Sequence, residues 1–313
     1  QQRPYSINRY NQGFYETQDI WKQEVNTDFL LSYKNQLTQK IGLNASIGGN
    51  AMDYKYRRTD ASVNGLVVPA VYKLANGVNN PIVQTYDRNK KVNSLYGLVS
   101  LSLDNSLFLD LTGRNDWSST LPKANNSFFY PSASASFILS EVAELPKAFS
   151  YAQLRASVAQ VGNDTQPYQT SGAFISQTAY NGQPTFSNQN FIPNANLRPE
   201  QTTSYEVGAD IRFLKDRIRL DATYYNALTK DQIISLPIAI SSGYNQQVVN
   251  GGEVRTQGVE LIADLTPILT ANFKWNTTFN FSSNTSRVES LPQSDGRLTL
   301  AYSRIYDSAN QTV

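Results

Sequence analysis

Residues 204–225 alternate between apolar and polar side chains, with one break at Lys215-Asp216. The apolar set is Tyr205, Val207, Ala209, Ile211 and Phe213 before the break, and Ile218, Leu220, Ala222 and Tyr224 after it. The residues between them are Glu206, Gly208, Asp210, Arg212, Arg219, Asp221 and Thr223. Successive side chains of a strand point to opposite faces, so the pattern predicts a β-hairpin with one apolar and one polar face. The apolar face must cover either a protein core or lipid.

The same period of two recurs along the chain and predicts an all-β fold. It indicates ten strands, at residues 18–33, 37–58, 89–103, 106–115, 128–140, 149–161, 203–214, 217–232, 254–266 and 271–289. An eleventh strand is expected at 296–306. Helical periodicity is nearly missing, and only residues 140–149 predict a helical turn.

Short and long connections alternate between these strands. Short turns are expected at Lys34-Asn35, Asp104–Ser106, 141–148, Lys215-Asp216 and 266–269. The long connections contain "NGVNNP" (76–81), "NDWSSTLPKANN" (115–126), residues 162–202 and residues 233–253. Bacterial outer-membrane barrels sort their connections in this way, with short turns at the periplasmic end and long loops outside. The chain therefore predicts an antiparallel up-and-down transmembrane β-barrel segment, whose apolar face touches lipid.

A water-soluble fold would also show alternating strands, because each barrel strand carries only a weak signal. The second hypothesis is therefore a β-rich surface adhesin or carbohydrate-binding module. Washing membranes with carbonate separates the two, since a barrel stays with the membrane and a soluble module leaves it. No apolar run approaches the eighteen or so residues of a transmembrane helix.

Composition excludes several classes of function. The 313 residues contain neither cysteine nor histidine, which excludes thiol catalysis, the Ser-His-Asp triad and His-ligated or Cys-ligated metals. A carboxylate enzyme and a calcium-binding acidic loop remain compatible with this composition. Because the mixed charges of the polar face suit a lumen better than catalytic pairs, we predict no catalytic residue, metal site or cofactor, and a protein that is not an enzyme. A net charge of +2 is too small to indicate a nucleic-acid partner.

Four residues of the expected outer loops are candidates for ligand contact, namely Asp116, Trp117, Tyr180 and Tyr244. An exposed Trp ring offers an apolar face on which a sugar can stack. The alternative is structural, with Asp116 bonded to nearby backbone and Trp117 anchored at the membrane interface. The charged side chains of the polar face are expected to line a lumen and to pair across strands: Glu206, Asp210, Arg212, Arg219, Asp221, Glu260 and Asp264.

Four longer motifs carry a resemblance to a known family. They are "LTGRNDWSSTLP" (111–122) with "FFYPSASASFILSE" (128–141), "LRASVAQVGND" (154–164), the hairpin at 194–234, and "NGGEVRTQGVEL" (250–261). Each resembles an element of the SusC/RagA family of TonB-linked outer-membrane proteins of Bacteroidota. The motifs occur in the family's order over roughly residues 90–290.

The resemblance implies a plugged barrel, energised by TonB, that imports glycans or peptides with a SusD/RagB-like surface lipoprotein. Plugged transporters of this kind have 22 strands, about twice the number predicted for this chain. We therefore expect residues 1–313 to be a partial barrel domain, with the plug, the TonB box and the C-terminal strand lying outside it. The implied location is the outer membrane of a Gram-negative bacterium.

Overall fold

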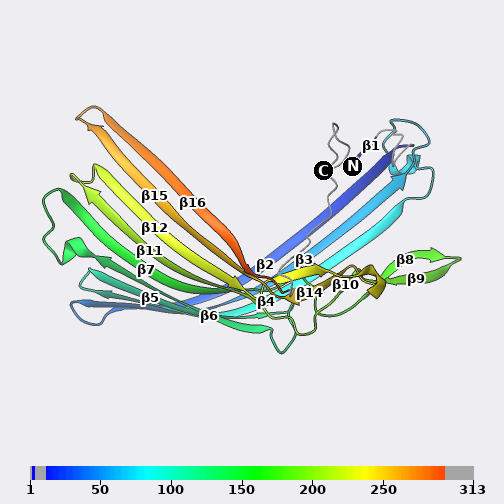
Figure 1. The fold of residues 1–313 in the computed structure, drawn as a ribbon, viewed down its shortest axis with the longest axis horizontal. Helices are drawn as coiled ribbons and strands as arrows, with labels where there is room; N and C mark the ends of the chain where they lie inside the picture. The colour runs from blue at the N-terminus through cyan, green and yellow to red at the C-terminus, as the bar shows by residue number, and fades with distance from the viewer. Residues whose placement is uncertain (1, 4–11, 293–313) are drawn as a thin grey trace. The chain divides into compact units, whose positions relative to one another are not determined.

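The computed structural model describes residues 2–3 and 12–292, and the main element of this part is an eleven-stranded sheet (Figure 1). Its order is β1-β2-β3-β4-β5-β6-β7-β11-β12-β15-β16. The strands are β1 (Gln2–Arg3), β2 (Phe14–Gln36), β3 (Ile41–Asn64), β4 (Ile82–Leu103), β5 (Leu107–Ser118), β6 (Ser127–Ile138), β7 (Phe149–Asn163), β11 (Glu200–Phe213), β12 (Ile218–Lys230), β15 (Glu253–Leu269) and β16 (Lys274–Ser290). The ten long strands confirm the ten predicted from the sequence, while the expected strand at 296–306 lies outside the described residues.

Several connections contain short elements of their own. A hairpin is formed by β8 (Phe174–Tyr180) and β9 (Gln183–Asn188). A small sheet has the order β10-β14-β13, from β10 (Phe191–Ile192), β13 (Ile233–Pro237) and β14 (Gln246–Asn250). The 3-10 turns are η1 (Leu74–Asn76), η2 (Leu139–Glu141) and η3 (Ile240–Ser242). Thus the predicted long connections 162–202 and 233–253 are present and contain short strands, and the expected helical turn at 140–149 is reduced to η2. No helix of the described part is long and apolar enough to span a membrane.

The chain divides into two compact units. The first comprises Gln1–Thr27 with Asn50–Val92, and the second comprises Asp28–Gly49 with Asn93–Val313. β2, β3 and β4 contribute one part of their length to each unit, whereas all later strands belong to the second.

Within the second unit, the short connections share one end of the sheet and are hydrogen-bonded to neighbouring connections or strand ends. Ile138 N donates to Ser106 O at 2.7 Å, Leu214 N donates to Ala148 O at 2.8 Å, and Thr266 N donates to Arg217 O at 2.7 Å. Consecutive residues with positive φ reverse the chain at two of these turns: Asp104 and Asn105, then Leu214, Lys215 and Asp216. Two predicted turns are displaced, because β2 continues to Gln36 and β15 continues to Leu269.

A conventional hydrophobic core is small in the described part of this fold. Its cluster joins Leu121, Leu197 and Val248, with Phe128, Phe191 and Ile233 packed against it. These residues come from the connections and the strand ends next to them, not from the centre of the large sheet. The apolar side chains of the sheet itself therefore need a different environment.

Candidate functional site

One face of the second unit's sheet is apolar and open. The register aligns Ala135, Ala156, Val207, Tyr224 and Val259 across five strands, all on this face. Exposed side chains of the same unit include Val207 at 55%, Leu154 at 53% and Phe281 at 59%. Such a continuous row of open apolar side chains is rare on water-soluble monomers and is typical of a lipid-facing wall.

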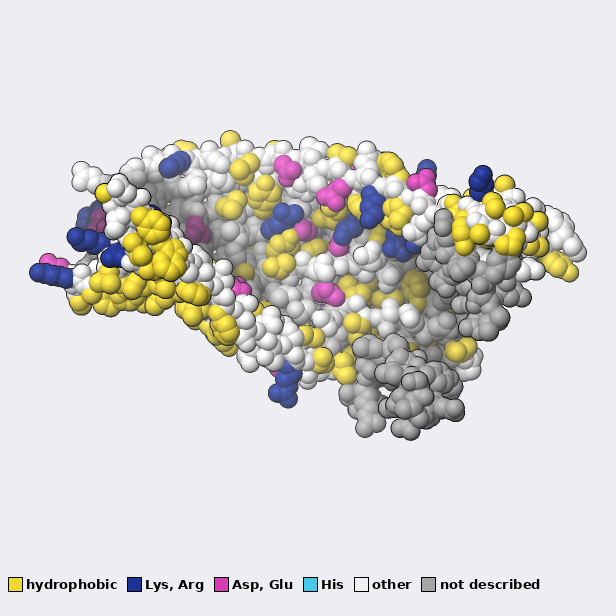
Figure 2. All heavy atoms as spheres, turned by 90° about the horizontal axis from the view of Figure 1, so that it is seen from above, with side chains coloured by type: hydrophobic (Ala, Val, Ile, Leu, Met, Phe, Trp, Pro, Cys, Tyr) yellow, Lys and Arg dark blue, Asp and Glu magenta, His cyan; other side chains and the backbone are white. Residues whose placement is uncertain are grey.

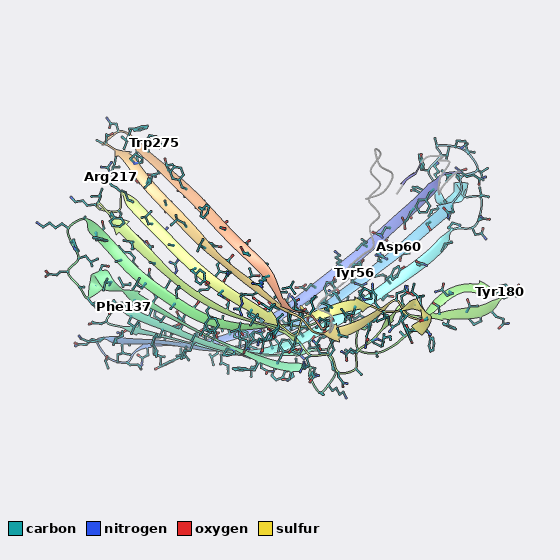
Figure 3. The ribbon with its side chains drawn as sticks, viewed as in Figure 1. Tyr56, Asp60, Phe137, Tyr180, Arg217 and Trp275 are labelled. Atoms are coloured by element: carbon teal, nitrogen blue, oxygen red, sulfur yellow. The ribbon has the colours of Figure 1, made fainter. Side chains whose placement is uncertain are left out.

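Aromatic side chains lie at both ends of this sheet. Trp117 and Phe129 are near the end with long connections, whereas Phe149 and Phe213 pack with ring centroids 4.8 Å apart at the other end. Figure 3 shows Trp275 at that second end. At about 3.3 Å per residue and a tilt of about 40°, the strand from 107 to 117 spans about 25 Å along the membrane normal, the height of the apolar band of an outer-membrane barrel.

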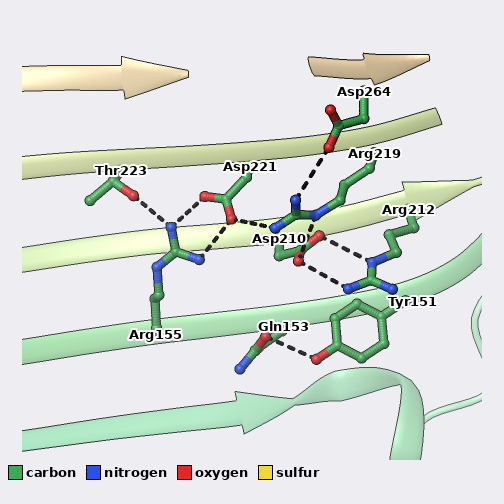
Figure 4. A network of polar contacts seen from close by, with 9 residues as sticks. All are labelled: Tyr151, Gln153, Arg155, Asp210, Arg212, Arg219, Asp221, Thr223 and Asp264. Carbon is green, nitrogen blue, oxygen red and sulfur yellow. Dashed lines mark hydrogen bonds and ion pairs between the residues drawn. The ribbon is translucent and has the colours of Figure 1, made fainter. Parts of the chain in front are cut away.

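The opposite face carries a network of paired charges centred on Arg219 (Figure 4). Its guanidinium group donates to Asp210 at 3.0 Å, to Asp221 at 3.0 Å and to Asp264 at 3.3 Å. Arg212 also pairs with Asp210, at 3.3 Å. Asp210 is 4% exposed and Asp221 is 9% exposed, so these carboxylates are better enclosed than the apolar side chains. Figure 2 shows Lys or Arg and Asp or Glu side chains lying next to one another on the sheet.

The register explains why this network must pair diagonally. Asp210 lies directly opposite Asp221, and Arg212 lies directly opposite Arg219. Like charges opposite each other are destabilising, and the carboxylates pair elsewhere. Asp210 reaches Arg219, which lies two residues along β12 from the residue opposite it. Asp221 pairs with Arg219 on its own strand and with Arg155 of β7. The predicted pairing across the hairpin is confirmed for Asp210 with Arg219, and Arg219 extends the network to Asp264 on β15.

Gly208 has a role in this network that the sequence did not indicate. Arg155 extends from β7 across β11 to Asp221 on β12, with which it makes a bidentate contact, and also donates to Thr223 at 2.6 Å. A Cβ on Gly208 would lie 2.7 Å from Arg155 Nε. The bare backbone at Gly208 thus leaves the passage through which Arg155 crosses one strand to reach the next.

A second polar cluster surrounds Asp116. Its carboxylate accepts hydrogen bonds from Arg114 Nε at 2.7 Å and from the Tyr130 hydroxyl, and Arg114 also donates to Ser94 at 2.7 Å. Asp116 is buried and lies within β5, so its prediction as a loop residue was wrong. The expected contact of its side chain with backbone is replaced by contacts to other side chains. Asp116 thereby ties β5 to β6.

The other three candidate residues lie apart from Asp116. Trp117 is 39% exposed and lies within β5 on the apolar face, because it shares the alternation of Leu109 and Leu111. Tyr180 is 72% exposed at the end of β8, and Tyr244 is half-buried in the connection before β14. The four residues therefore lie on different elements or faces: Asp116 and Trp117 on opposite faces of β5, Tyr180 on β8 and Tyr244 in the connection before β14.

The long connections are held together by amide side chains. Asn125 Nδ2 donates to Leu197 O at 3.1 Å, and Asn250 Nδ2 donates to Arg198 O at 2.8 Å and to Asp231 O at 3.0 Å. Arg198 completes the cluster with an ion pair to Asp231 at 2.7 Å. These bonds join three connections that are far apart in the sequence, so an ordered layer covers the end of the second unit's sheet.

The second unit's sheet forms a wall with two unlike surfaces. Among residues 2–3 and 12–292, no group of three or more His, Cys, Asp or Glu side chains is placed to hold a metal ion. The enclosed carboxylates of Asp210 and Asp221 have guanidinium partners within the same sheet. What the geometry provides is an apolar surface on one side, a polar surface on the other, and an ordered cap of connections.

Known proteins resemble the chain in both sequence and fold. The family model described as "TonB dependent receptor-like, beta-barrel" matches residues 1–311. TonB-dependent receptor P26 of Formosa agariphila is 30% identical over 206 residues, covering 64% of this chain and 21% of that protein. TonB-dependent receptor SusC of Bacteroides thetaiotaomicron is 31% identical over 103 residues, covering 33% of this chain and 10% of SusC. The structure of the RagAB peptide transporter superposes with a TM-score of 0.78 at 19% identity, over 91% of this chain and 32% of that one. The chain thus spans about a fifth of the length of the first of these relatives.

Proposed function

Because this chain belongs to the family of TonB-dependent receptor-like β-barrels, we propose that it forms wall and outer loops of a nutrient importer in the bacterial outer membrane. The family consists of receptors and transporters and is not an enzyme class. The apolar face would contact lipid, and the paired charges of the opposite face would line the lumen. Mixed charges that neutralise one another suit a polar lumen, since they stay hydrated and leave no isolated charge in the wall.

The observation that carries this proposal is that apolar side chains of the sheet are exposed while charged side chains are buried. Val207 and Leu154 are more than half exposed, while Asp210 and Asp221 on the opposite face of the sheet are buried. In water that distribution would leave apolar surface uncovered along several strands, at a free-energy cost of about 25 cal/mol per Å². In a bilayer the same side chains are solvated by hydrocarbon, so the distribution becomes favourable.

The relatives support a proposal for the cargo and the partners. SusC and the RagAB peptide transporter support import of an oligomer, either a glycan or a peptide. A surface lipoprotein like SusD or RagB is the expected outer partner, and TonB is the expected source of energy through a part of the protein outside this chain. SusC and P26 come from Bacteroidota, which supports the same origin here.

We also propose that residues 1–313 act as one segment of a longer barrel. The described sheet has β1 and β16 at its two ends, and an unpaired strand edge costs several kcal/mol per polar group in hydrocarbon. Further strands would pair with these edges. The chain's coverage of only 21% of P26 and 32% of the RagAB chain supports this arrangement.

Uptake by cells that carry the full-length protein tests the proposal. Cells are given labelled mixtures of oligosaccharides and of peptides, with TonB present or deleted. We expect one mixture to accumulate only when the full-length protein and TonB are both present. Accumulation that persists without TonB would indicate a passive porin, and accumulation of neither mixture would contradict the proposed import of oligomers.

A further inference from the structure

β2, β3 and β4 are longer than a membrane requires. These strands contain 23, 24 and 22 residues, about twice the nine to eleven that cross a bilayer at a tilt. Their second-unit parts are residues 28–36 of β2, 41–49 of β3 and 93–103 of β4. Each of these parts is already long enough to cross the bilayer. In the sequence, the first-unit part of each strand is the part more distant from the short turns that precede Ile41 and follow Leu103. Because the proposed function makes those turns periplasmic, we infer that the first-unit parts belong to the extracellular side.

The first unit carries an excess of positive charge. Residues 1–27 and 50–92 together contain ten Lys and Arg against six Asp and Glu, and the excess lies in residues 50–92. The whole chain has a net charge of only +2, so the remaining residues together are slightly acidic. Positive charge concentrated on one stretch attracts anions, at rates and affinities that depend on salt.

One face of the region combines these cations with tyrosine rings. Lys22 Nζ lies 5.8 Å from the centroid of the Tyr56 ring, and the Arg88 guanidinium lies 5.9 Å from the same ring. The Arg58 guanidinium lies 4.2 Å from the centroid of the Tyr86 ring. We call Lys22, Tyr56, Arg58, Tyr86 and Arg88 the cation–tyrosine platform. Its members on β3 occupy alternate positions of that strand, where Figure 3 labels Tyr56.

The rings leave the cations able to bind a further group. A cation over an aromatic face is held without losing its N–H donors, so a guanidinium group can still bind carboxylate or sulfate oxygens with two hydrogen bonds. Arg58 is already partly neutralised, because its Nη2 pairs with Asp60 at 3.0 Å. Lys22 and Arg88 have no carboxylate partner in the ion pairs of the described part of this unit.

The opposite face of the same strands provides a contrast. There Arg57 pairs with Asp87 at 2.8 Å, and Lys91 pairs with Asp53 at 3.3 Å. Lys55 shares this face by alternation. Two of its three cations are therefore already neutralised by carboxylates from a neighbouring strand, which leaves less attraction for a further anion.

We propose that the cation–tyrosine platform binds an acidic glycan, a saccharide chain that carries carboxylate or sulfate groups, and so selects the cargo of the importer. The inference rests on the proposed function for its extracellular position. Guanidinium groups bind carboxylate and sulfate oxygens with two hydrogen bonds, and the attraction of several cations favours a chain that carries several such groups. An extended peptide is less suited, because β3 already pairs with β2 and β4 and offers no free edge for strand addition.

Calorimetric titration of the purified full-length protein tests this assignment. The probes are a heptameric oligogalacturonate, a sulfated galactose oligosaccharide, neutral maltoheptaose and hexaglutamate. The test variant combines Lys22→Gln, Arg58→Gln and Arg88→Gln, and so removes the three cations of the platform.

The matched control variant combines Lys55→Gln, Arg57→Gln and Lys91→Gln on the opposite face. Both variants lose three positive charges from the first unit and gain three glutamines. A difference between them therefore reports the position of the charges and not their number.

We expect at least one acidic oligosaccharide to bind, with an affinity that falls as salt increases. The platform variant should lose about 30-fold in affinity and the control less than about threefold, since only the platform makes the charge-assisted contacts. Equal losses in the two variants, equal binding of maltoheptaose or hexaglutamate, or no binding of either acidic oligosaccharide would overturn the assignment. Binding is measured on purified protein, so its failure is distinct from a failure of TonB-dependent uptake.

Discussion

Val207→Arg should largely abolish assembly of the full-length protein in the outer membrane, whereas Glu206→Arg should leave it nearly intact. The two residues are neighbours on β11, and both side chains are exposed. Val207 lies on the apolar face and Glu206 on the polar face, because side chains alternate along the strand. Arginine near the bilayer midplane on the lipid face costs about 2–4 kcal/mol, which is a large fraction of the stability of a typical fold. On the polar face the new guanidinium group stays hydrated.

The two variants introduce the same residue at adjacent positions of one strand, so they differ mainly in the face of the sheet that receives the arginine. Assembly is followed by the heat-modifiable gel mobility of the full-length protein in membrane fractions. Equal mobility and equal yield for the two variants would contradict the assignment of faces. The reverse order, with Glu206→Arg failing to assemble, would place lipid on the charged side.

Epitope tags should divide the connections of the second unit into two classes. Tags after Tyr180 or Tyr244 are expected to bind antibody on intact cells, and tags at Asp104 or Asp216 only after the outer membrane is opened. The antiparallel strand order places the connections of the two tyrosines and the turns of the two aspartates at opposite strand ends. The difference should be nearly all-or-none, since antibodies do not cross an intact outer membrane.

Each tagged protein must assemble, which heat-modifiable mobility checks independently. Staining of Asp216 on intact cells, with none at Tyr180, would reverse the orientation. Staining of all four sites would contradict a spanning sheet and would favour a surface-attached β-rich module.

The ten long strands could be predicted because a strand's period is local. The alternation at 204–225 determines which residues share a face, and a short turn then brings the two halves together in one register. The apolar face was predicted from the same residues, although alternation alone left open whether it covers a core or lipid. The exposure of Val207 and the family match now favour lipid.

The short strands in the connections could not be found in this way. β10 contains two residues and pairs in parallel with β14, which lies more than fifty residues later. Leu121, Leu197 and Val248 meet only because three connections fold over one end of the sheet. No local period marks such contacts, because the segments that make them are distant in the sequence and must first close long loops.

The sequence predicted that the charged side chains pair, but it did not predict which partners they choose. The charge pairing of the hairpin follows from the composition of its polar face, but the diagonal choice of partners follows from the register. Asp116 was expected near backbone, whereas Tyr130 and Arg114 reach its carboxylate from β6 and β5. In the sequence Gly208 is only a small residue on a polar face, whereas the structure shows that the Arg155 side chain passes over it.

A spin-label scan through β11 tests the lipid-facing wall residue by residue. This chain contains no cysteine, so single cysteines at positions 204–212 of the full-length protein, freed of any cysteine elsewhere, can each carry one nitroxide. Collisions with oxygen report lipid, and collisions with a water-soluble nickel chelate report water. We expect the ratio of oxygen to nickel collisions to alternate with a period of two, with maxima at the odd positions from 205 to 211. A flat profile, or maxima at the even positions from 206 to 210, would contradict a lipid-facing wall on the apolar side of β11.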